Sequence, residues 1–406
     1  LKQLDEAKKR DHRRIGKDLD LFSFHLEGAG FPFWHPKGTL LYNNVMDYCR
    51  TEHLNFGYQE IKTPIILNEK LWRQSGHWDK YRENMYFTEI DETMHAVKPM
   101  NCPGGLLVYK SKPHSYREFP IKNFEFGLVH RHEKAGVLHG LFRVRQFTQD
   151  DAHIFCLPDQ IEAQIHEVYD FVVKMYGVFG FKDYKVELST RPEEFIGSPD
   201  IWDKAEAALK NVLDDKNIDY QINPGDGAFY GPKIDFHILD CLERSWQCGT
   251  IQLDFSMPER FELEYTDEDS TKKRPVMIHR ALLGSMERFI GIMLENYAGD
   301  LPLWLNPVHG RILPISEKFN GYGKKIQQQF TAIGLQVELD ERNEKIGKKI
   351  REAEKDKIPY GLIVGEKEEK EGAISIRKRK IGDLGNFPID EIIEKFKLEI
   401  LNKEIS

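Results

Sequence analysis

The most informative stretch for the fold is "FGLVHRHEKAGVLHGLFRVRQFTQDDAHIF", residues 126–155. Both ends of the stretch are rich in apolar and aromatic residues, and its middle is polar and contains two glycines. Short apolar runs on either side of a polar, glycine-containing segment are typical of two paired strands. The stretch therefore predicts two strands between residues 119 and 156, joined by a polar loop.

Basic residues gather around this loop. Arg131 and Glu133 are two residues apart, so on a strand both side chains face the same side of the sheet. We expect Arg143 and Arg145 on the same face of the opposing strand. Three arginines on one face repel one another unless an anion lies among them, and the guanidinium fork suits a phosphate or a carboxylate. An ordinary ladder of surface ion pairs is the alternative, and neither standard phosphate-binding loop occurs in the sequence.

The remaining pattern predicts two domains that meet near residue 306. In the first, we expect helices at 39–57, 159–178 and 202–217, and strands at 58–66 (ended by Pro64), 184–190 and 249–255. A strand end followed by a helix is expected within residues 279–298. Beyond residue 306, strands and helices alternate and finish with a hairpin and a last helix. This order predicts a small α/β domain with a mixed sheet.

Composition narrows the class of protein. The chain has 406 residues, of which 40% are hydrophobic, so it can bury large cores. No uninterrupted apolar stretch is long enough for a membrane span, and the charged start cannot be a signal peptide. Five cysteines without paired spacing predict a reduced, cytoplasmic protein. Because the sequence lacks an initiator methionine, we expect it to be part of a longer chain.

The net charge of −8 by itself argues against a nucleic-acid partner. Its distribution changes this interpretation, because residues 310–406 carry 20 Lys and Arg against 18 Asp and Glu. The basic residues also cluster, in "RNEKIGKKIRE" and "SIRKRK". A solvated helix face explains the first cluster equally well, yet such local basic stripes suit a phosphate backbone.

Three residues far apart in the sequence could together bind a metal ion. Cys102, His153 and His279 offer one thiolate and two imidazoles, a set that suits a zinc site with an open coordination position. Asp151 is two residues before His153 and therefore faces the same side of a strand. The alternative is that each is a structural residue, since buried Cys and His are common.

At these residues the chain resembles the threonyl-tRNA synthetases, which are class II aminoacyl-tRNA synthetases. "GYQEIKTP", "HRHEKAGVLHGLFRVRQF" and "GSMERF" resemble class motifs 1, 2 and 3. The resemblance extends to "KPMNCPG", "FTQDDAHIF", "GAFYGPKIDF" and "WQCGTIQLDF", and covers nearly the whole chain. Prolyl and seryl enzymes share the three motifs but not this set of one Cys and two His.

The resemblance implies a fold and a domain order. It implies an α/β (α+β) protein whose class II antiparallel sheet is flanked by helices and followed by a small α/β anticodon-binding domain with a mixed sheet. Residues 1–16 would be a linker helix from a missing N-terminal region, 17–305 the catalytic domain and 306–406 the anticodon-binding domain. The implied protein is a cytoplasmic homodimer, joined through motif 1 at Pro64, with no membrane association.

The resemblance also implies an activity: activation of L-threonine with ATP, then transfer of threonine to the 3′ end of tRNA(Thr). One Zn²⁺ per chain would recognise the threonine amine and hydroxyl, and Mg²⁺ would accompany ATP. The implied site residues are these: zinc ligands Cys102, His153 and His279; threonine contacts Asp151, Tyr230 and Gln149; ATP contacts Arg131, Glu133, Arg143, Phe147, Gln247, Gln252 and Arg288; catalytic groups Arg131, Arg288, Lys233 and His77, the last beside the tRNA ribose; anticodon contacts Asn343, Arg351, Glu368 and Arg377.

Two expectations concern selectivity. A pocket that pairs the threonine hydroxyl leaves groups unpaired when valine binds, which is worth about 10⁴–10⁵ in selectivity, whereas serine lacks only one methyl group and is rejected only about 10–200-fold. No stretch resembles the family's editing domain, so we expect measurable charging with serine. Gly105 also departs from the family's usual His. A relative that binds tRNA without charging it, and a prolyl enzyme, are the alternative interpretations.

Overall fold

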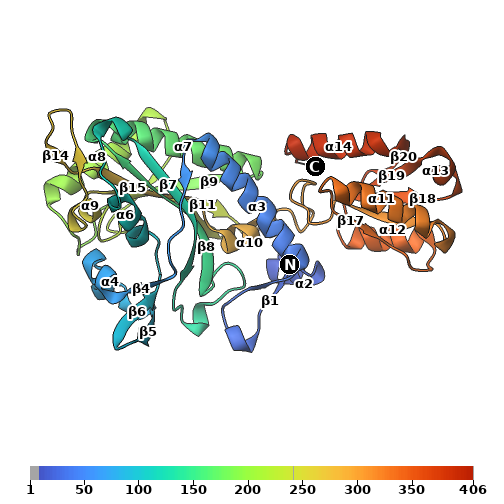
Figure 1. The fold of residues 1–406 in the computed structure, drawn as a ribbon, viewed down its shortest axis with the longest axis horizontal. Helices are drawn as coiled ribbons and strands as arrows, with labels where there is room; N and C mark the ends of the chain where they lie inside the picture. Colours follow the sequence, from blue (N-terminus) through green and yellow to red (C-terminus); the bar gives the residue numbers. More distant parts are fainter. Residues whose placement is uncertain (1–8, 241, 406) are drawn as a thin grey trace. The chain divides into compact units, whose positions relative to one another are not determined.

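The computed structural model describes residues 9–240 and 242–405 (Figure 1). The contacts divide the chain into two compact units. One unit consists of Phe24–Pro32 and Tyr48–Met293, and the other of the segments that end at Ser23, span Phe33–Asp47 and begin at Leu294. The first eight residues of the expected 1–16 linker helix lie outside the described residues. The bounds of the three expected segments stay predictions.

The larger unit is built on an eight-stranded sheet with the order β10-β9-β11-β12-β15-β8-β7-β3. Every neighbouring pair is antiparallel except the two outermost, β10 with β9 and β3 with β7. This confirms the expected antiparallel sheet. The strands are β3 Gln59–Glu60, β7 Ile121–His130, β8 Gln146–Cys156, β9 Tyr184–Ser189, β10 Gln221–Asn223, β11 Lys233–Leu239, β12 Ser245–Asp254 and β15 Val276–Ser285.

The two faces of this sheet differ in chemistry. On β11, Ile234 and Phe236 are fully buried, and Phe236 packs against Tyr169 and Tyr176 of helix α7, Ile161–Val178. Helix α7 also packs against helix α8, Pro199–Asp215, and the two helices cover this face of the sheet (Figure 1). The residues that alternate with these two along β11, Lys233 and Asp235, point to the opposite face, because side chains alternate along a strand. That opposite face carries the polar residues.

Further helices and small groups of strands complete the first part of the chain. The helices are α2 His12–Asp18, α3 Pro36–Asn55, α4 Glu69–Ser75, α5 His77–Lys80, α6 Cys102–Lys110, α9 Ser256–Arg260 and α10 Met286–Asn296. Three small antiparallel groups of strands are β1 Phe22–Ser23 with β2 Phe33–Trp34, β4 Ile66–Asn68 with β6 Thr93–Val97 and β5 Tyr86–Ile90, and β13 Tyr265–Thr266 with β14 Lys272–Lys273.

The C-terminal part has its own five-stranded sheet, with the order β17-β16-β18-β19-β20. The pairs of β16 with β17 and with β18 are parallel and the others are antiparallel, which confirms the expected mixed sheet. Its elements are β16 Gly310–Pro314, α11 Asn320–Ala332, β17 Val337–Leu339, α12 Ile346–Lys355, β18 Tyr360–Val364, α13 Glu366–Glu371, β19 Ala373–Lys378, β20 Gly382–Pro388 and α14 Ile389–Leu401.

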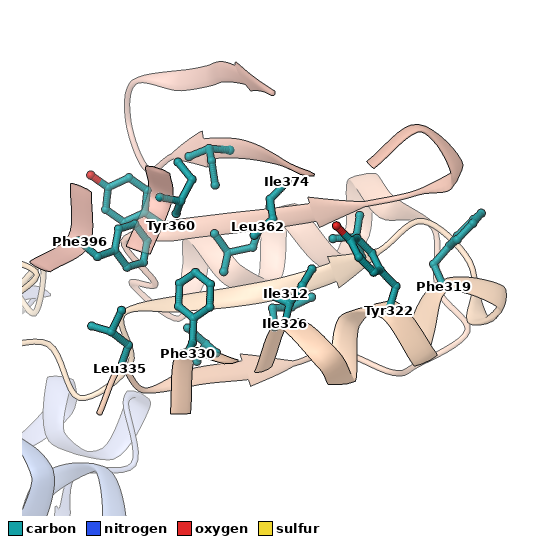
Figure 2. Close-up of a cluster of buried hydrophobic side chains, with 14 of the residues drawn as sticks. Ile312, Phe319, Tyr322, Ile326, Phe330, Leu335, Tyr360, Leu362, Ile374 and Phe396 are labelled. Atoms are coloured by element: carbon teal, nitrogen blue, oxygen red, sulfur yellow. The ribbon is translucent and has the colours of Figure 1, made fainter. Parts of the chain in front are cut away.

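An apolar core holds this C-terminal sheet to helices α11 and α14. Figure 2 shows side chains from α11, β16, β18, β19 and α14 meeting in it. The ring of Phe396 lies 4.6 Å from that of Tyr360 and 5.9 Å from that of Phe330, measured between centroids. The Tyr360 hydroxyl donates a 2.6 Å hydrogen bond to Glu399, so its buried polar atom is paired.

Two elements of the structure differ from the prediction. The expected strand at 58–66 is broken, because β3 ends at Glu60 and the chain resumes as β4 in another sheet. Pro64 lacks the N–H that would continue a ladder, and Thr63 instead donates from its backbone and hydroxyl to Glu125. Strand β20 was not predicted, because its Gly382, Gly385 and Pro388 are residues typical of turns.

His309, just before β16, gives a testable pH dependence. It accepts a 2.9 Å hydrogen bond at Nδ1 from the backbone N–H of Gln336, and burial lowers its pKa to about 4. The unfolded chain binds a proton at this residue below about pH 6.5, whereas the folded chain does so only below about pH 4. Stability therefore falls as pH decreases through this window, by about 3 kcal/mol from His309 alone.

We expect His309→Asn, which keeps an acceptor that does not titrate, to lose correspondingly less stability between pH 7 and pH 4.5. Urea unfolding of the C-terminal part, followed at both pH values, measures the difference. The other histidines contribute equally to the pH-dependent loss of stability of the parent and of the variant, so their effects cancel in the difference. An equal loss in the variant and the parent would contradict the assignment.

Among the described residues, no helix is both long and apolar enough to cross a membrane.

Candidate active site and metal site

Strand register brings the site residues together in rows across the polar face of the large sheet. His153 on β8 is opposite His279 on β15, His279 is opposite Gln252 on β12, and Gln252 is opposite Lys233 on β11. The next row, two residues along each strand, contains Asp151, Ala281, Thr250 and Asp235. Residues up to 130 positions apart in sequence, Asp151 and Ala281, thus become neighbours, because antiparallel pairing aligns them.

Helix α6 supplies the third candidate metal ligand. Cys102 is its first residue and packs in one apolar cluster with Phe155 of β8 and Met277 of β15. Phe155 is two residues after His153 and Met277 is two residues before His279, so both point to the same face as the histidines. Helix α6 therefore covers that face of the sheet. The ligand atoms of Cys102, His153 and His279 all lie within 4.8 Å of one another, and all three residues are buried.

The chemistry of this triad fits a metal ion. Nε2 of His153 is buried without a hydrogen-bond partner, and burial lowers the pKa of this histidine to about 4, so its imidazole is neutral at pH 7. Burial, Asp151 and Asp254 raise the pKa of the Cys102 thiol well above its ordinary value. A cation between these groups would satisfy the unpaired nitrogen and favour the thiolate, and one Cys with two His is a set typical of zinc.

Asp151 lies beside the triad in a fixed orientation. Its Oδ2 accepts a 3.1 Å hydrogen bond from the Asn101 amide, and its Oδ1 is 3.7 Å from Nε2 of His153. Tyr230 closes another side of this region, with its ring centroid 5.3 Å from that of His279. A carboxylate and an aromatic wall next to the triad suit a small polar ligand.

A cavity of about 160 Å³ opens on the same face of the sheet. Six of the seven predicted ATP contacts line it, together with Gln149. The seventh, Gln252, is buried and donates to the carbonyl of Gly231. The predicted residues that line the cavity are Arg131, Glu133, Arg143, Phe147, Gln149, Gln247 and Arg288.

Two guanidinium groups in this cavity have no carboxylate partner among the described residues. Arg131 donates to the carbonyl of Pro99 and lies 5.1 Å from the ring centroid of Phe147. Arg288 donates to the carbonyls of Phe142 and Gln247. Burial, with Arg131 and Arg143 nearby, lowers the pKa of Arg288. Partly buried cations without a carboxylate partner around a cavity favour an anionic ligand.

The prediction that Arg143 and Arg145 face Arg131 from the opposing strand was wrong. Strand β8 begins only at Gln146, so Arg143 and Arg145 lie in the preceding loop rather than on a strand. Arg143 pairs with Glu133 at 3.1 Å. Arg145 turns away and donates to the carbonyls of Glu133 and Ala29. Arg288, from the start of α10, takes its place in the cavity.

The structure does not bring Lys233 and His77 into this cavity. Lys233 pairs with Asp235 at 2.7 Å, in a network that Gln247 and Thr250 join. His77 is fully buried, with Nδ1 2.7 Å from the hydroxyl of Ser75 and Nε2 2.8 Å from the sulfur of Met100. Burial lowers its pKa to about 3, so it is neutral at pH 7. A role at a tRNA ribose requires this ring to leave its pocket and stays a prediction.

Three of the four predicted anticodon contacts lie close together in the C-terminal part. Arg351 and Arg377 line one cavity of about 540 Å³ with Arg379 and Lys380. Glu368 accepts a 2.7 Å hydrogen bond from Ser375, which is on the same face of β19 as Arg377. Asn343 lies in the loop between β17 and α12 and is not among the cavity-lining residues. The basic cavity suits a phosphate-bearing ligand.

Gly105 lies directly behind a candidate metal ligand. A Cβ atom at this position would be 3.2 Å from Nδ1 of His153, a contact that requires the ring to shift by a few tenths of an ångström. The residue that the sequence comparison singled out therefore controls the space behind the His153 ring. We have no physical account of why glycine occupies it here.

The sequence interpretation missed two residues that hold this site. Asn101 fixes Asp151, and Asp254 lies 2.8 Å from Nε2 of His279. Asp254 is on the same face as Gln252, diagonally opposite His279, and only the strand register reveals that relation. Asn101 and Asp254 stand within the stretches KPMNCPG and WQCGTIQLDF, but neither stretch by itself indicates these contacts.

Two family descriptions match the chain. Residues 86–297 match the tRNA synthetase class II core domain (G, H, P, S and T), and residues 310–399 match an anticodon binding domain. The antiparallel sheet, the arginine-lined cavity and the second mixed sheet agree with these matches. The fold and the site thus define a class II tRNA synthetase core.

Individual relatives narrow the family. The threonine–tRNA ligases of Carboxydothermus hydrogenoformans and Caldanaerobacter subterraneus subsp. tengcongensis are 59% and 58% identical over 98% and 100% of the chain. A crystal structure described as the RNA binding domain of threonyl-tRNA synthetase from Cryptosporidium parvum Iowa II superposes with a TM-score of 0.94, at 43% identity, covering 96% of this chain and 98% of that one. The chain therefore belongs to the threonyl-tRNA synthetase family. It spans 63% of the length of these two ligases.

Proposed function

We propose that the chain activates L-threonine with ATP, giving threonyl-adenylate and pyrophosphate, and then transfers threonine to the 3′ end of tRNA(Thr). The observation that carries this proposal is the position of the Cys102, His153 and His279 triad, with Asp151 beside it. The triad lies on the same sheet face as the arginine-lined cavity. An amino-acid pocket and an ATP pocket must adjoin, because the carboxylate of the bound threonine attacks the α-phosphate of the bound ATP.

Threonine recognition would depend on Asp151 and on a metal ion held by the triad. When bound, Zn²⁺ would offer open coordination positions to the amine and the hydroxyl of threonine. Asp151, oriented by Asn101, would accept the hydroxyl hydrogen, and Tyr230 and Gln149 would border the pocket. Valine would leave Asp151 unpaired in a buried site, a cost that shape alone cannot provide.

Activation would depend mainly on positioning and charge. Arg131 and Arg288 would bind the ATP phosphates, and Mg²⁺ would accompany the nucleotide. Phe147 and Arg288 line the same cavity and would enclose the adenine ring. Because both guanidinium groups are already held by backbone carbonyls, they need little reorganisation as charge develops on the α-phosphate.

Transfer would follow on the same face, with the anticodon bound by the C-terminal part at Arg351, Arg377 and Glu368. His77 would act at the tRNA ribose after leaving its buried position, and Lys233 would approach the adenylate by leaving Asp235. We also propose a cytoplasmic homodimer joined through motif 1 around Pro64. The free, buried cysteines at four of five positions suit a reducing compartment.

Amino-acid-dependent ATP–pyrophosphate exchange tests the proposal. We expect exchange with threonine, exchange with serine that is about 10–200-fold less efficient in kcat/KM, and valine at least about 10⁴-fold below threonine. The reason is that serine keeps the hydroxyl that Asp151 accepts, and valine does not. The exchange must also be lost after removal of the metal ion by a chelator.

The alternatives give different results in the same assay. Exchange with none of the amino acids, in a protein that retains its metal ion, would favour a tRNA-binding relative without charging activity. Exchange with proline alone would contradict the threonyl assignment.

A further inference from the structure

Asp254 is a fully buried carboxylate at the end of β12, with 0% of its surface exposed. Its Oδ1 accepts hydrogen bonds from the backbone N–H groups of Ser256, at 2.7 Å, and Met257, at 3.0 Å. Its Oδ2 is 2.8 Å from Nε2 of His279. Both oxygens are thus engaged, and the start of α9 holds the carboxylate in one orientation.

This arrangement decides which nitrogen of His279 is available. A carboxylate only accepts hydrogen bonds, so the Nε2 atom that faces it carries the hydrogen. The neutral ring then has its lone pair on Nδ1, which is the only nitrogen of His279 left for a metal ion. The Nε2–H group cannot turn away without leaving Oδ2 of Asp254 unpaired in a fully buried place.

His153 offers the opposite nitrogen. Its Nε2 is the buried atom without a hydrogen-bond partner, while its Nδ1 faces the space next to Gly105. The rings of His153 and His279 meet edge to face, with centroids 5.1 Å apart and planes at 85°. Two neighbouring histidines therefore present different nitrogens, and only His279 has a carboxylate that fixes its hydrogen.

We propose that Asp254 is the positioning residue of the metal site, which holds His279 as the Nε2–H tautomer so that Nδ1 binds the ion. This inference rests on the proposed function, in which Cys102, His153 and His279 hold Zn²⁺. Carboxylates that bind the far nitrogen of a metal-bound histidine fix its ring and increase its basicity, and their loss typically weakens metal binding about 10–100-fold.

The variant Asp254→Asn tests the tautomer directly. The asparagine oxygen is needed by the two backbone N–H groups of Ser256 and Met257, so the NH₂ group must face His279. It then donates to Nε2, which moves the hydrogen of the ring to Nδ1 and blocks that nitrogen. The variant keeps the size of the side chain and its hydrogen bonds to the start of α9. It reverses the hydrogen bond to His279, because the side chain at position 254 now donates to Nε2 instead of accepting from it.

Asp240→Asn is the matched control. Asp240 is also buried, and its Oδ1 accepts two backbone N–H groups, those of Leu242 and Arg244. Its Oδ2 accepts from the side chains of Arg244 and Trp246 rather than from a candidate ligand. The control therefore carries the same chemical change and a comparable loss of stability, without a connection to the triad.

The measurement is the Zn²⁺ affinity of the full chain at pH 7.5, by competition with a chromogenic chelator. We expect Asp254→Asn to weaken binding about 10–100-fold and Asp240→Asn to change it less than about twofold. An affinity of Asp254→Asn equal to that of the parent overturns the inference and leaves the proposed function intact. A parent chain that binds no Zn²⁺ overturns the zinc part of the proposed function instead.

A second measurement applies if Asp254→Asn does not fold. In the metal-free parent, the ¹³Cδ2 and ¹⁵N chemical shifts of His279, assigned with a His279→Gln variant, report its tautomer. We expect the Nε2–H form. Observation of the Nδ1–H form would overturn the inference.

Discussion

Replacing Cys102 with alanine is expected to reduce Zn²⁺ affinity by roughly 10³-fold, and threonine-dependent ATP–pyrophosphate exchange with it. Zinc sites in which protein side chains supply all ligands bind with about 10–16 kcal/mol, so one thiolate accounts for roughly 4 kcal/mol. With a metal ion bound, Cys102 would be the only anionic ligand of the triad, and the two imidazoles that remain would not offset the charge of the ion. Metal analysis of the purified variant measures the loss.

Cys156→Ala is the matched control for this variant. Cys156 is a buried free cysteine on β8, three residues beyond His153, and it is not part of the triad. Its loss removes the same atoms from the interior and costs stability, but the metal content should stay at one ion per chain. A stoichiometric metal ion in Cys102→Ala would show that the triad is not the zinc site.

Arg131→Ala is expected to lower kcat/KM for ATP–pyrophosphate exchange by about 10²–10³-fold, as for removal of one preorganised group that stabilises transition-state charge. Arg131 has no carboxylate partner among the described residues and is held by the carbonyl of Pro99. The charge it would stabilise develops on the α-phosphate, so the effect should fall mainly on kcat. Pre-steady-state adenylate formation separates this effect from weaker ATP binding.

Two further variants sharpen this prediction. Arg131→Lys keeps the charge but loses the planar fork, so most of the loss should remain. Arg143→Ala should cost less, because Glu133 already pairs with that guanidinium at 3.1 Å. Equal losses for Arg131→Ala and Arg143→Ala would contradict a special role of Arg131 at the phosphate.

The fold was predictable to the extent that its pattern is local. The helices at 159–178 and 202–217 and the alternation of strands and helices beyond residue 306 follow from periodicity, and the structure confirms them within a few residues. Pro64 was expected to end a strand, but the earlier end of β3 at Glu60, the start of β4 at Ile66 and the whole of strand β20 were missed. Glycine and proline signal a turn equally well within and outside a sheet. Whether such a residue lies within a sheet depends on the strands that pair beside it in the fold.

The candidate site divides in the same way. The chemistry available was readable without the structure: one thiol, two imidazoles and a carboxylate for a metal ion and an amino acid, and a surplus of arginines for an anion. The resemblance to a family assigned these residues to one site before the structure gave their positions. The three-dimensional fold was needed to show that Arg145 turns away from the cavity, that His77 is buried, and that Asp254 contacts His279. The physical reason is that antiparallel register and side-chain alternation set which residues become neighbours, and both depend on pairing between strands far apart in sequence.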